Sequence, residues 1–451
     1  MELSHELFVQ FRQALREQAQ DEVLRLLEDW HPTDLAQVFH DLSIEEADYL
    51  YTILDPDLAA EILTELDEQD RERFLSRRTA RDIAEKFVEN LDSDDAADIL
   101  SELPEERQRE ILAEINDPEV ASDIVDLLQY DEYSAGGLMA KEMVRIREDW
   151  SRDRIIQEIR EQASEIENVY SVYVVDDQDR LKGLMPLKRL LIEPDHVPLH
   201  QIYIDKVVYV DVHTPREKVA QTMQKYDLVA MPVVDQLGRL VGRITIDDVV
   251  DVMQEEAGKD YQLLSGLSED VESDDHIWPL TRARIPWLLV GLMGGILGAN
   301  VISQYEDQIQ IHPEMAYFIP LIAAMGGNAG VQSSAIIVQG LANNSLRKGA
   351  ALNKFLKELA VGLLNGLVCA LVVLAYNLLF SNELPLALTV GSSLLTVIVT
   401  ASVMGTFIPL TLNKFGVDPA LATGPFITTM NDVLGIFIYF LTGRMMYAYL
   451  M

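Results

Sequence analysis

The carboxylate of Asp432 is the group in this chain whose surroundings most clearly suggest chemistry. It lies inside the apolar segment 426–439, whereas every other acid after Arg284 lies at the edge of an apolar run or between runs. A carboxylate inside a membrane-length apolar segment is costly and usually faces a water-filled cavity on an ion or proton pathway. The alternative is a structural carboxylate, neutralised or hydrogen-bonded to a neighbouring helix. The segment holds no Lys, Arg or His to pair with it, which favours the pathway.

A second polar feature lies in an earlier apolar run, at residues 320–334. Glycines and amides interrupt this run, at Gly326, Gly327, Asn328, Gly330 and Gln332. Small residues in membrane helices often serve close helix packing alone. An interrupted helix can also expose backbone carbonyls to a pore. We therefore expect a broken helix here whose oxygen atoms lie near Asp432.

Neutral amide oxygens beside one carboxylate are the ligands of a hard cation. Mg²⁺ sheds its waters reluctantly and is usually held, partly hydrated, by one or two carboxylates. One Asp cannot surround a pore, so we expect two chains to meet on a two-fold axis as a homodimer. Gly326, Gly327, Asn328, Gln332 and Asn431 are the predicted pore-lining residues.

The charge of the chain is divided unevenly between two parts. Residues 1–280 hold 67 acidic and 28 basic residues, and residues 281–451 hold 7 acidic and 8 basic residues. A strongly acidic surface repels nucleic acid and attracts cations. The one cysteine, Cys369, excludes an internal disulfide framework. The first residues have neither a basic nor an apolar signal region, so we expect no cleavable signal peptide and a cytoplasmic acidic part.

The elements that must position these residues begin with a helical repeat over residues 34–129. Apolar residues close each unit at steps of 12 or its multiples, with one residue of slippage, as at Leu42, Leu54, Leu66 and Leu103. Turn signals such as Asp55-Pro56 and Asp117-Pro118 separate the units. This pattern predicts an all-α superhelical domain over residues 1–134. We expect most of its outer-face acids to be solvated: Glu61, Glu65, Asp92, Asp94, Asp95 and Asp98.

A duplicated α/β unit follows. Residues 172–184 read as strand, acidic turn and strand, and the same pattern returns 59 residues later from Met231. The repeated pattern resembles tandem cystathionine-β-synthase (CBS) domains, expected at residues 135–199 and 200–257. Such pairs are regulatory and can hold adenine nucleotides; a purely structural dimerisation pair is the alternative. A long acidic helix and polar linker are expected over residues 248–280.

Five apolar runs predict a transmembrane domain over residues 281–451. Each of the runs 285–303, 315–341, 359–380, 386–412 and 424–450 reaches the ~17–25 residues that span a bilayer. Loop cations follow the second and fourth runs, at Arg347, Lys348, Lys354, Lys357 and Lys414. Only acids follow the first and third: Glu306, Asp307, Glu314 and Glu383. The positive-inside rule then places the N-terminus in the cytoplasm and the C-terminus outside.

Over essentially its whole length the chain resembles the MgtE family of bacterial magnesium channels or transporters. The motifs that carry this resemblance are Ala-Gly-Gly-Leu-Met at 135–139, Gly-Gly-Asn-Ala-Gly-Val-Gln-Ser at 326–333, Gly-Val-Asp-Pro-Ala at 416–420 and Asn-Asp-Val-Leu-Gly at 431–435. The resemblance implies a homodimeric Mg²⁺ pore in the bacterial cytoplasmic membrane, in contact with lipid and lined mainly by the second and fifth spans. It implies that Asp432 holds hydrated Mg²⁺.

The resemblance also implies gating by cytoplasmic Mg²⁺, bound between the helical domain, the CBS pair and the connecting, or plug, helix. The positions that match the family's metal sites are Glu61, Asp94, Asp98, Gly137 (through its carbonyl), Asp227, Asp248, Asp251, Glu256, Asp260 and Asp418. Two residues depart from the family pattern. Lys259 replaces an acid of the plug helix, and Gly424 replaces a polar residue near the pore mouth.

Two other functions remain open at this point. The chain could transport another divalent ion such as Co²⁺ or Ni²⁺, but only Met430 offers a soft ligand beside Asp432. It could be a membrane-anchored nucleotide sensor, but such a sensor has no need for Asp432. An enzyme is not expected, because no nucleophile–base pair or phosphate loop stands out.

Overall fold

The computed structural model describes residues 5–28, 30–164, 166, 168–194, 196–268, 271, 276–342, 351–380 and 384–450. Arg347, Lys348 and Glu383, which the predicted membrane orientation uses, lie outside the described residues, as does most of the polar linker 265–275. The chain forms two compact units, residues 1–254 and residues 255–451.

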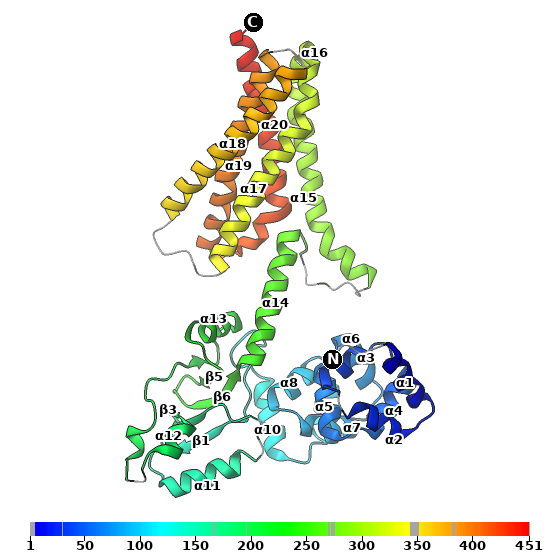
Figure 1. The fold of residues 1–451 in the computed structure, drawn as a ribbon, viewed down its shortest axis with the longest axis vertical. Coiled ribbons are helices and arrows are strands. Elements are labelled where there is room, and N and C mark those ends of the chain that lie inside the picture. Colours follow the sequence, from blue (N-terminus) through cyan, green and yellow to red (C-terminus); the bar gives the residue numbers. More distant parts are fainter. Residues whose placement is uncertain are drawn as a thin grey trace. The chain divides into compact units, whose positions relative to one another are not determined.

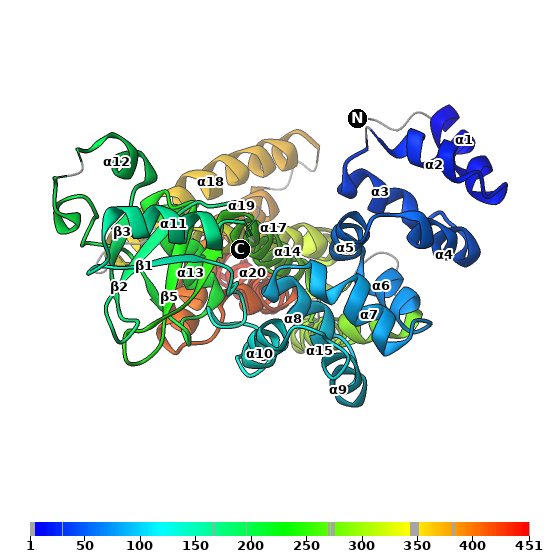
Figure 2. The ribbon, with the colours of Figure 1, turned by 90° about the horizontal axis from the view of Figure 1, so that it is seen from below.

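The first unit begins with short helices in a curved row, drawn in blue to cyan (Figures 1 and 2). They are α1 His5–Arg16, α2 Gln20–Leu27, α3 Pro32–Phe39, α4 Ile44–Ile53, α5 Pro56–Thr64, α6 Glu68–Leu75, α7 Ala80–Lys86, the 3₁₀ turn Val88–Asn90, α8 Ser93–Ser101, α9 Glu105–Leu112 and α10 Pro118–Leu127. The expected turn signals start helices: Asp55 caps α5 and Asp117 caps α10, each followed by proline at the first helical position. Each helix buries one apolar stripe in a continuous core. The predicted superhelical fold is confirmed.

Two three-stranded sheets with the same topology follow. The first joins β1 Val144–Arg147, β2 Val172–Val175 and β3 Leu181–Met185, and the second joins β4 Val210–Asp211, β5 Ala230–Val234 and β6 Leu240–Thr245. In each sheet a parallel pair is followed by an antiparallel pair. The helices of this part are α11 Arg152–Gln162, α12 Leu187–Ile192, the 3₁₀ turn Leu199–Gln201 and α13 Arg216–Tyr226. The predicted duplication of an α/β fold is confirmed.

Helix α14, Ile246–Ser265, starts directly after β6 and continues through Gly258. Its last part belongs to the second unit. There the chain turns back at Gly266 and is fastened to the next helix, because both the backbone N–H and the hydroxyl of Ser268 donate to the Ala283 carbonyl, at 3.0 and 2.9 Å.

Within the described residues, five helices are long and apolar enough to cross a membrane. They are α15 Ile277–Gln304, α17 Ile319–Ala342, α18 Ala351–Phe380, α19 Leu384–Lys414 and α20 Thr428–Leu450 (Figure 1). Short elements join them: α16 Glu306–Ile311, the 3₁₀ segments Pro313–Phe318 and Pro419–Ala422, and the π-helical turn Thr423–Ile427. The prediction of five spans is confirmed, and α19 is the most buried of them.

The predicted break in the second span is wrong. Helix α17 is continuous through Gly326, Gly327 and Gly330. Its backbone groups stay paired within the helix, as a membrane environment requires, and the glycines allow close packing against α19 and α20. The irregular backbone lies instead just before α20, where Gly424 leaves helical geometry at φ −34°, ψ −113°.

Candidate functional site

In the membrane unit, Asp432 lies in the second turn of α20 and faces the backbone of α17. A side chain added at Gly327 would place its Cβ 3.3 Å from Asp432 Oδ1, so the absence of a side chain there leaves the carboxylate beside the helix backbone. Asp432 is half-buried. Among the described residues, no donor hydrogen-bonds this carboxylate and no cation pairs with it. A buried carboxylate without a donor or a counter-charge is costly, which makes it a candidate for binding a cation.

Asn431, the residue before it, points into the helix packing. Its side chain is 2% exposed, and neither amide atom has a hydrogen-bond partner among the described residues. A Cβ at Gly330 would overlap Asn431 Nδ2, and a Cβ at Gly405 of α19 would overlap the Gly330 carbonyl oxygen. Asn431 therefore occupies the space that the glycine leaves between α17 and α20.

The structure divides the predicted pore-lining residues between two faces of α17. Gly326 and Gly327 face α20, close to Asn431 and Asp432. Asn328 and Gln332 are exposed on another face and line a cavity with α18 and α19. Within one chain, therefore, the amide oxygens of α17 do not lie beside the carboxylate.

The irregular turn before α20 contacts the end of α14. A Cβ at Gly424 would lie 2.6 Å from the Leu264 carbonyl oxygen, and a Cβ at Gly266 would lie 2.6 Å from Cγ of Pro425. Gly266 also has φ +82°, a conformation that favours glycine. Two backbones thus touch without intervening side chains. Glycine replaces the polar residue of the family pattern at position 424 for a steric reason, since a larger residue does not fit against the Leu264 carbonyl.

Nearby, Asp418 is exposed and accepts a hydrogen bond from the Ala420 N–H at 2.8 Å. It caps the short helix Pro419–Ala422, so its carboxylate has a structural role apart from any ion.

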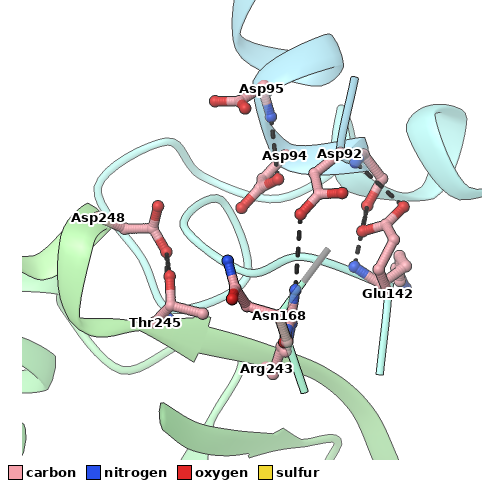
Figure 3. A network of polar contacts seen from close by, with 10 residues as sticks. Asp92, Asp94, Asp95, Glu142, Asn168, Arg243, Thr245 and Asp248 are labelled. Atoms are coloured by element: carbon pink, nitrogen blue, oxygen red, sulfur yellow. Dashed lines mark hydrogen bonds and ion pairs between the residues drawn. The ribbon is translucent and has the colours of Figure 1, made fainter. Parts of the chain in front are cut away.

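A second candidate site lies in the first unit, where α8 approaches the second CBS sheet (Figure 3). One carboxylate oxygen from each of Asp92, Asp94 and Glu142 lies within 4.8 Å of the other two. Glu142 also accepts hydrogen bonds from the N–H and the hydroxyl of Ser93, at 3.1 and 2.9 Å. Glu142 thereby satisfies an N–H group in the first turn of α8, a helix whose Asp92 cap makes no such bond.

Crowding changes the acidity of these groups. The surrounding protein removes water from Asp94 and, with the charge of Asp248, raises the pKa of Asp94 well above its ordinary value. Partial desolvation and neighbouring carboxylates raise the pKa of Asp95 to about 7 and the pKa of Asp98 to about 7. The folded protein therefore holds carboxylates together that would repel one another when ionised.

Asp248 connects this cluster to the start of α14. Its carboxylate accepts hydrogen bonds from the Thr245 N–H at 3.1 Å and from the Thr245 hydroxyl at 2.6 Å. Desolvation still raises the pKa of Asp248. The nearest cation is Arg243, whose guanidinium is buried, pairs with Asp92 at 3.5 Å and donates to the Asn168 carbonyl at 3.0 Å (Figure 3).

The remaining predicted positions in the first unit lie apart from this cluster or at its edge. Glu61 in α5 and Asp251 in α14 are exposed and have partners of their own. Asp227 ends α13 in the left-handed conformation, φ 51°, a position that favours Gly, Asn or Asp for structural reasons. The backbone of Gly137 packs on Asp131 and Glu132, which leaves no room for a side chain.

In the second unit, Glu256 and Asp260 lie one turn apart on α14. Lys259 lies on the same helix, with its ammonium 3.6 Å from the Glu256 carboxylate. The family pattern has an acid at position 259. This chain has Lys259 there instead, and its ammonium group lies beside the predicted metal ligand Glu256.

Sequence reasoning missed Glu142 and Arg243 and treated Asp92 and Asp95 as outer-face acids. Of the six outer-face acids, Glu61, Glu65, Asp95 and Asp98 are exposed as expected, whereas Asp92 and Asp94 are half-buried. Glu142 lies 49 residues from its partner Ser93. No local pattern signals such a contact.

The donor chemistry of both sites fits a hard divalent cation. Each offers carboxylate oxygens, with no cysteine or histidine ligand among the residues named above. Another group, His40, Asp67 and Asp70, includes a histidine, and Asp70 raises the pKa of His40 through a hydrogen bond of 3.0 Å.

Three family models match the chain. A divalent cation transporter model, MgtE, matches residues 319–442; the MgtE intracellular N domain matches residues 30–133; and a CBS domain matches residues 199–255.

Two relatives of known name give the same result. The magnesium transporter MgtE of Thermus thermophilus is 33% identical over 98% of this chain and 99% of its own length. The magnesium transporter MgtE of Enterococcus faecalis is 35% identical over 72% of this chain and 71% of its own.

Two solved structures resemble the non-membrane part. The soluble part of a magnesium transporter matches with a TM-score of 0.51 and 29% identity, over 56% of this chain and 98% of that chain. The cytosolic domain of the Mg²⁺ channel MgtE in complex with ATP matches with a TM-score of 0.50 and 35% identity, over 54% of this chain and 99% of that chain.

Proposed function

Because the chain belongs to the MgtE family of divalent cation transporters, we propose that it carries Mg²⁺ across a membrane along a path past Asp432. The observation that carries this proposal is the half-buried Asp432 carboxylate, which no described residue neutralises or hydrogen-bonds. A Mg²⁺ ion that keeps its inner waters supplies both the missing charge and the missing donors.

A homodimer is part of this proposal. One chain places a single carboxylate on the path, and a two-fold axis would supply a second one opposite it. In that arrangement Asn328 and Gln332, which are exposed on α17 in one chain, can meet the partner's helices. This is how the predicted pore-lining residues would come together.

Flux through purified protein in liposomes tests the path. Asp432→Asn keeps the size of the side chain but removes its charge, and we expect Mg²⁺ uptake to fall at least about tenfold, the effect of losing ~1.4 kcal/mol of ion binding. Glu314→Gln, the matched loss of a carboxylate at another place in the membrane unit, should leave the flux unchanged. Full selective flux in Asp432→Asn would refute the proposed path.

We further propose that cytoplasmic Mg²⁺ closes the path by binding the acid cluster of the first unit. Asp92, Asp94, Asp95, Asp98 and Asp248 lie in one cluster, and the cations beside them are Arg243, which pairs with Asp92, and Arg71, which lies near Asp95 and Asp98. Divalent cations would relieve this repulsion, and depletion would restore it. Glu61, Gly137, Asp227, Asp251, Glu256 and Asp260 are proposed as further ligands. Helix α14, which has Asp248 in its first turn and ends against Gly424, would carry the change.

Neutralising Asp248, Asp251 and Glu256 together tests the sensor. We expect flux to persist at internal Mg²⁺ concentrations that stop the unaltered protein, because the charges that bind the closing ions are lost. Glu105→Gln, an exposed carboxylate of α9, is the matched control. An unchanged inhibition curve in the triple variant would exclude these residues as the sensor.

Adenine nucleotide is a proposed ligand of the CBS pair. The relative whose cytosolic domain was solved with ATP is 35% identical over 54% of this chain. ATP titration of the full chain, followed by calorimetry, tests the proposal. Heat equal to that of buffer alone would exclude binding.

The proposed location is the bacterial cytoplasmic membrane, with the N-terminus inside and the C-terminus outside. Lys354, Lys357 and Lys414 lie at the ends of spans that this orientation places in the cytoplasm. We propose the domain bounds 1–134, 135–199, 200–257, 248–280 and 281–451 with it. Competition of Mg²⁺ uptake by Co²⁺ and Ni²⁺ separates magnesium selectivity from transport of another divalent ion.

A further inference from the structure

A second polar cavity lies in the membrane unit, on the side of α17 away from Gly327. Its volume is about 340 Å³, and α17, α18 and α19 line it. The polar residues in its lining are Asn328, Gln332, Ser333, Glu358, Asn365 and Ser402. Carboxylate, amide and hydroxyl groups therefore surround one space between helices that are otherwise apolar.

Glu358 is the charged group of this cavity. Its side chain is 8% exposed, yet it has no hydrogen bond or ion pair with any described residue. Among the described residues that line the cavity, none is Lys, Arg or His. A carboxylate buried in this way needs a compensating charge or a proton, and the described residues supply neither charge nor donor.

The sequence of α18 carries a polar stripe that reaches along the same cavity. Glu358, Asn365 and Cys369 follow one another at helical spacing and all line it. The opposite side of α18 presents exposed apolar residues such as Leu363 and Leu367. Glu358 and Asn365 are about 10 Å apart along the helix axis, at about 1.5 Å per residue. The polar groups therefore extend along the length of the cavity and are not gathered at one place.

We propose that this cavity is a second cation site of the membrane unit, separate from Asp432, in which Glu358 binds a partly hydrated divalent cation. One carboxylate with neutral oxygens and no nitrogen or basic ligand is the donor set of a hard cation. The volume leaves room for several waters around the ion, since a water occupies about 30 Å³ in the liquid. The site goes beyond the proposed path, because its charged ligand is Glu358 of α18, which the proposed path does not use.

Cys369 provides a native reporter, because it is the one cysteine of the chain and lines this cavity. The full chain in proteoliposomes is treated with a cationic and an anionic methanethiosulfonate reagent, without Mg²⁺ and with saturating Mg²⁺. Intact-mass spectrometry follows modification of the thiol. The Cys369→Ser variant confirms that the added mass is at this position.

We expect the cationic reagent to react faster than the anionic one, because a carboxylate in a low-dielectric cleft concentrates cations about tenfold or more. Glu358→Gln should remove that preference and Glu358→Asp should keep it. Mg²⁺ should slow the cationic reagent in the unaltered chain but not in Glu358→Gln. Glu314→Gln, which alters a carboxylate outside this cavity, should behave as the unaltered chain.

Three results would overturn the proposal. The first is a Cys369 thiol that neither reagent reaches, which means a dry or covered cavity. The second is an equal charge preference in the unaltered chain and Glu358→Gln, or Mg²⁺ protection that persists in that variant. The third is loss of preference and protection in Asp432→Asn, which would place the ion at Asp432. Mg²⁺ flux through Asp432→Asn is measured separately, so failure of this site and failure of the proposed path are distinguishable.

Discussion

The contact between Gly424 and the end of α14 offers a sharp test of the gating proposal. Replacing Gly424 by alanine adds one methyl group at a position where Cβ would lie 2.6 Å from the Leu264 carbonyl oxygen. An ordinary carbon–oxygen contact is at least about 3.3 Å, so the two groups would overlap by about 0.7 Å. The neighbouring atom belongs to the backbone, which cannot move aside as a flexible side chain can.

The expected energy follows from this overlap. Adding a methyl group to a well-packed site costs about 1–3 kcal/mol. If α14 rests on Gly424 only when the path is closed, this cost falls on the closed state alone. The ratio of closed to open protein then falls by a factor of about 5 to 150.

The assay is Mg²⁺ flux into liposomes at a series of internal Mg²⁺ concentrations. We expect Gly424→Ala to raise the internal Mg²⁺ concentration that gives half-inhibition. The rise should reach the factor of about 5 to 150 if one ion sets the equilibrium, and should be smaller if several ions act together. Gly258→Ala is the matched control, because a Cβ at this position of the same helix α14 meets no atom within 4 Å. Its added helix propensity of about 1 kcal/mol should leave inhibition close to that of the unaltered chain.

An inhibition curve for Gly424→Ala that matches the unaltered chain would refute the reasoning. It would mean that the contact is present in both states or controls neither. A loss of flux at all Mg²⁺ concentrations would equally contradict it, because the overlap would then obstruct the path rather than the closing helix.

Further predictions concern the acid cluster and the helix packing. Because partial desolvation and neighbouring charges raise the pKa of Asp95 and of Asp98 to about 7, the folded protein binds more protons than the unfolded chain between about pH 4 and 7. Its stability should therefore decrease as the pH rises through that window. Added Mg²⁺ should therefore raise the thermal midpoint more at pH 8 than at pH 6 by calorimetry, and an equal rise would contradict the cluster as a binding site. Glu142→Ala should lower the free energy of unfolding by about 0.5–2 kcal/mol, as loss of a helix cap does. Glu119→Ala, at an exposed position of α10, serves as the control. Equal thermal midpoints of the two variants would show that the Ser93 contact adds nothing. Gly330→Ala should destabilise the membrane unit by about 1–3 kcal/mol, because its Cβ meets Asn431 Nδ2. Gly291→Ala is the control, because a Cβ there meets no atom within 4 Å. An unchanged thermal midpoint in both variants would contradict the described packing.

Local patterns in the sequence were enough to predict the classes of structure. The turn pairs Asp55-Pro56 and Asp117-Pro118 start helices because an aspartate caps the free N–H groups and proline fits the first position. The repeated strand–acidic turn–strand pattern at residues 172–184 and from Met231 predicts the duplicated sheets, since short apolar runs and the turns between them are local properties of the sequence. Run length alone predicts the five spans. Asp432 is singled out in the same way, by a charge within a run.

Contacts between distant segments required the tertiary structure. The glycines of α17 resemble a helix break in sequence, but the helix continues, and the side chain of Asn431 of α20 and the backbone of α19 at Gly405 pack closely against Gly330. The same packing turns Gly327 toward Asp432 and sends Asn328 and Gln332 to the cavity of Glu358. Likewise, Glu142 reaches Ser93 and Arg243 reaches Asp92 across long stretches of chain. Composition and periodicity thus determine which elements form and which groups are costly to bury, while the packing of those elements alone decides which groups face one another.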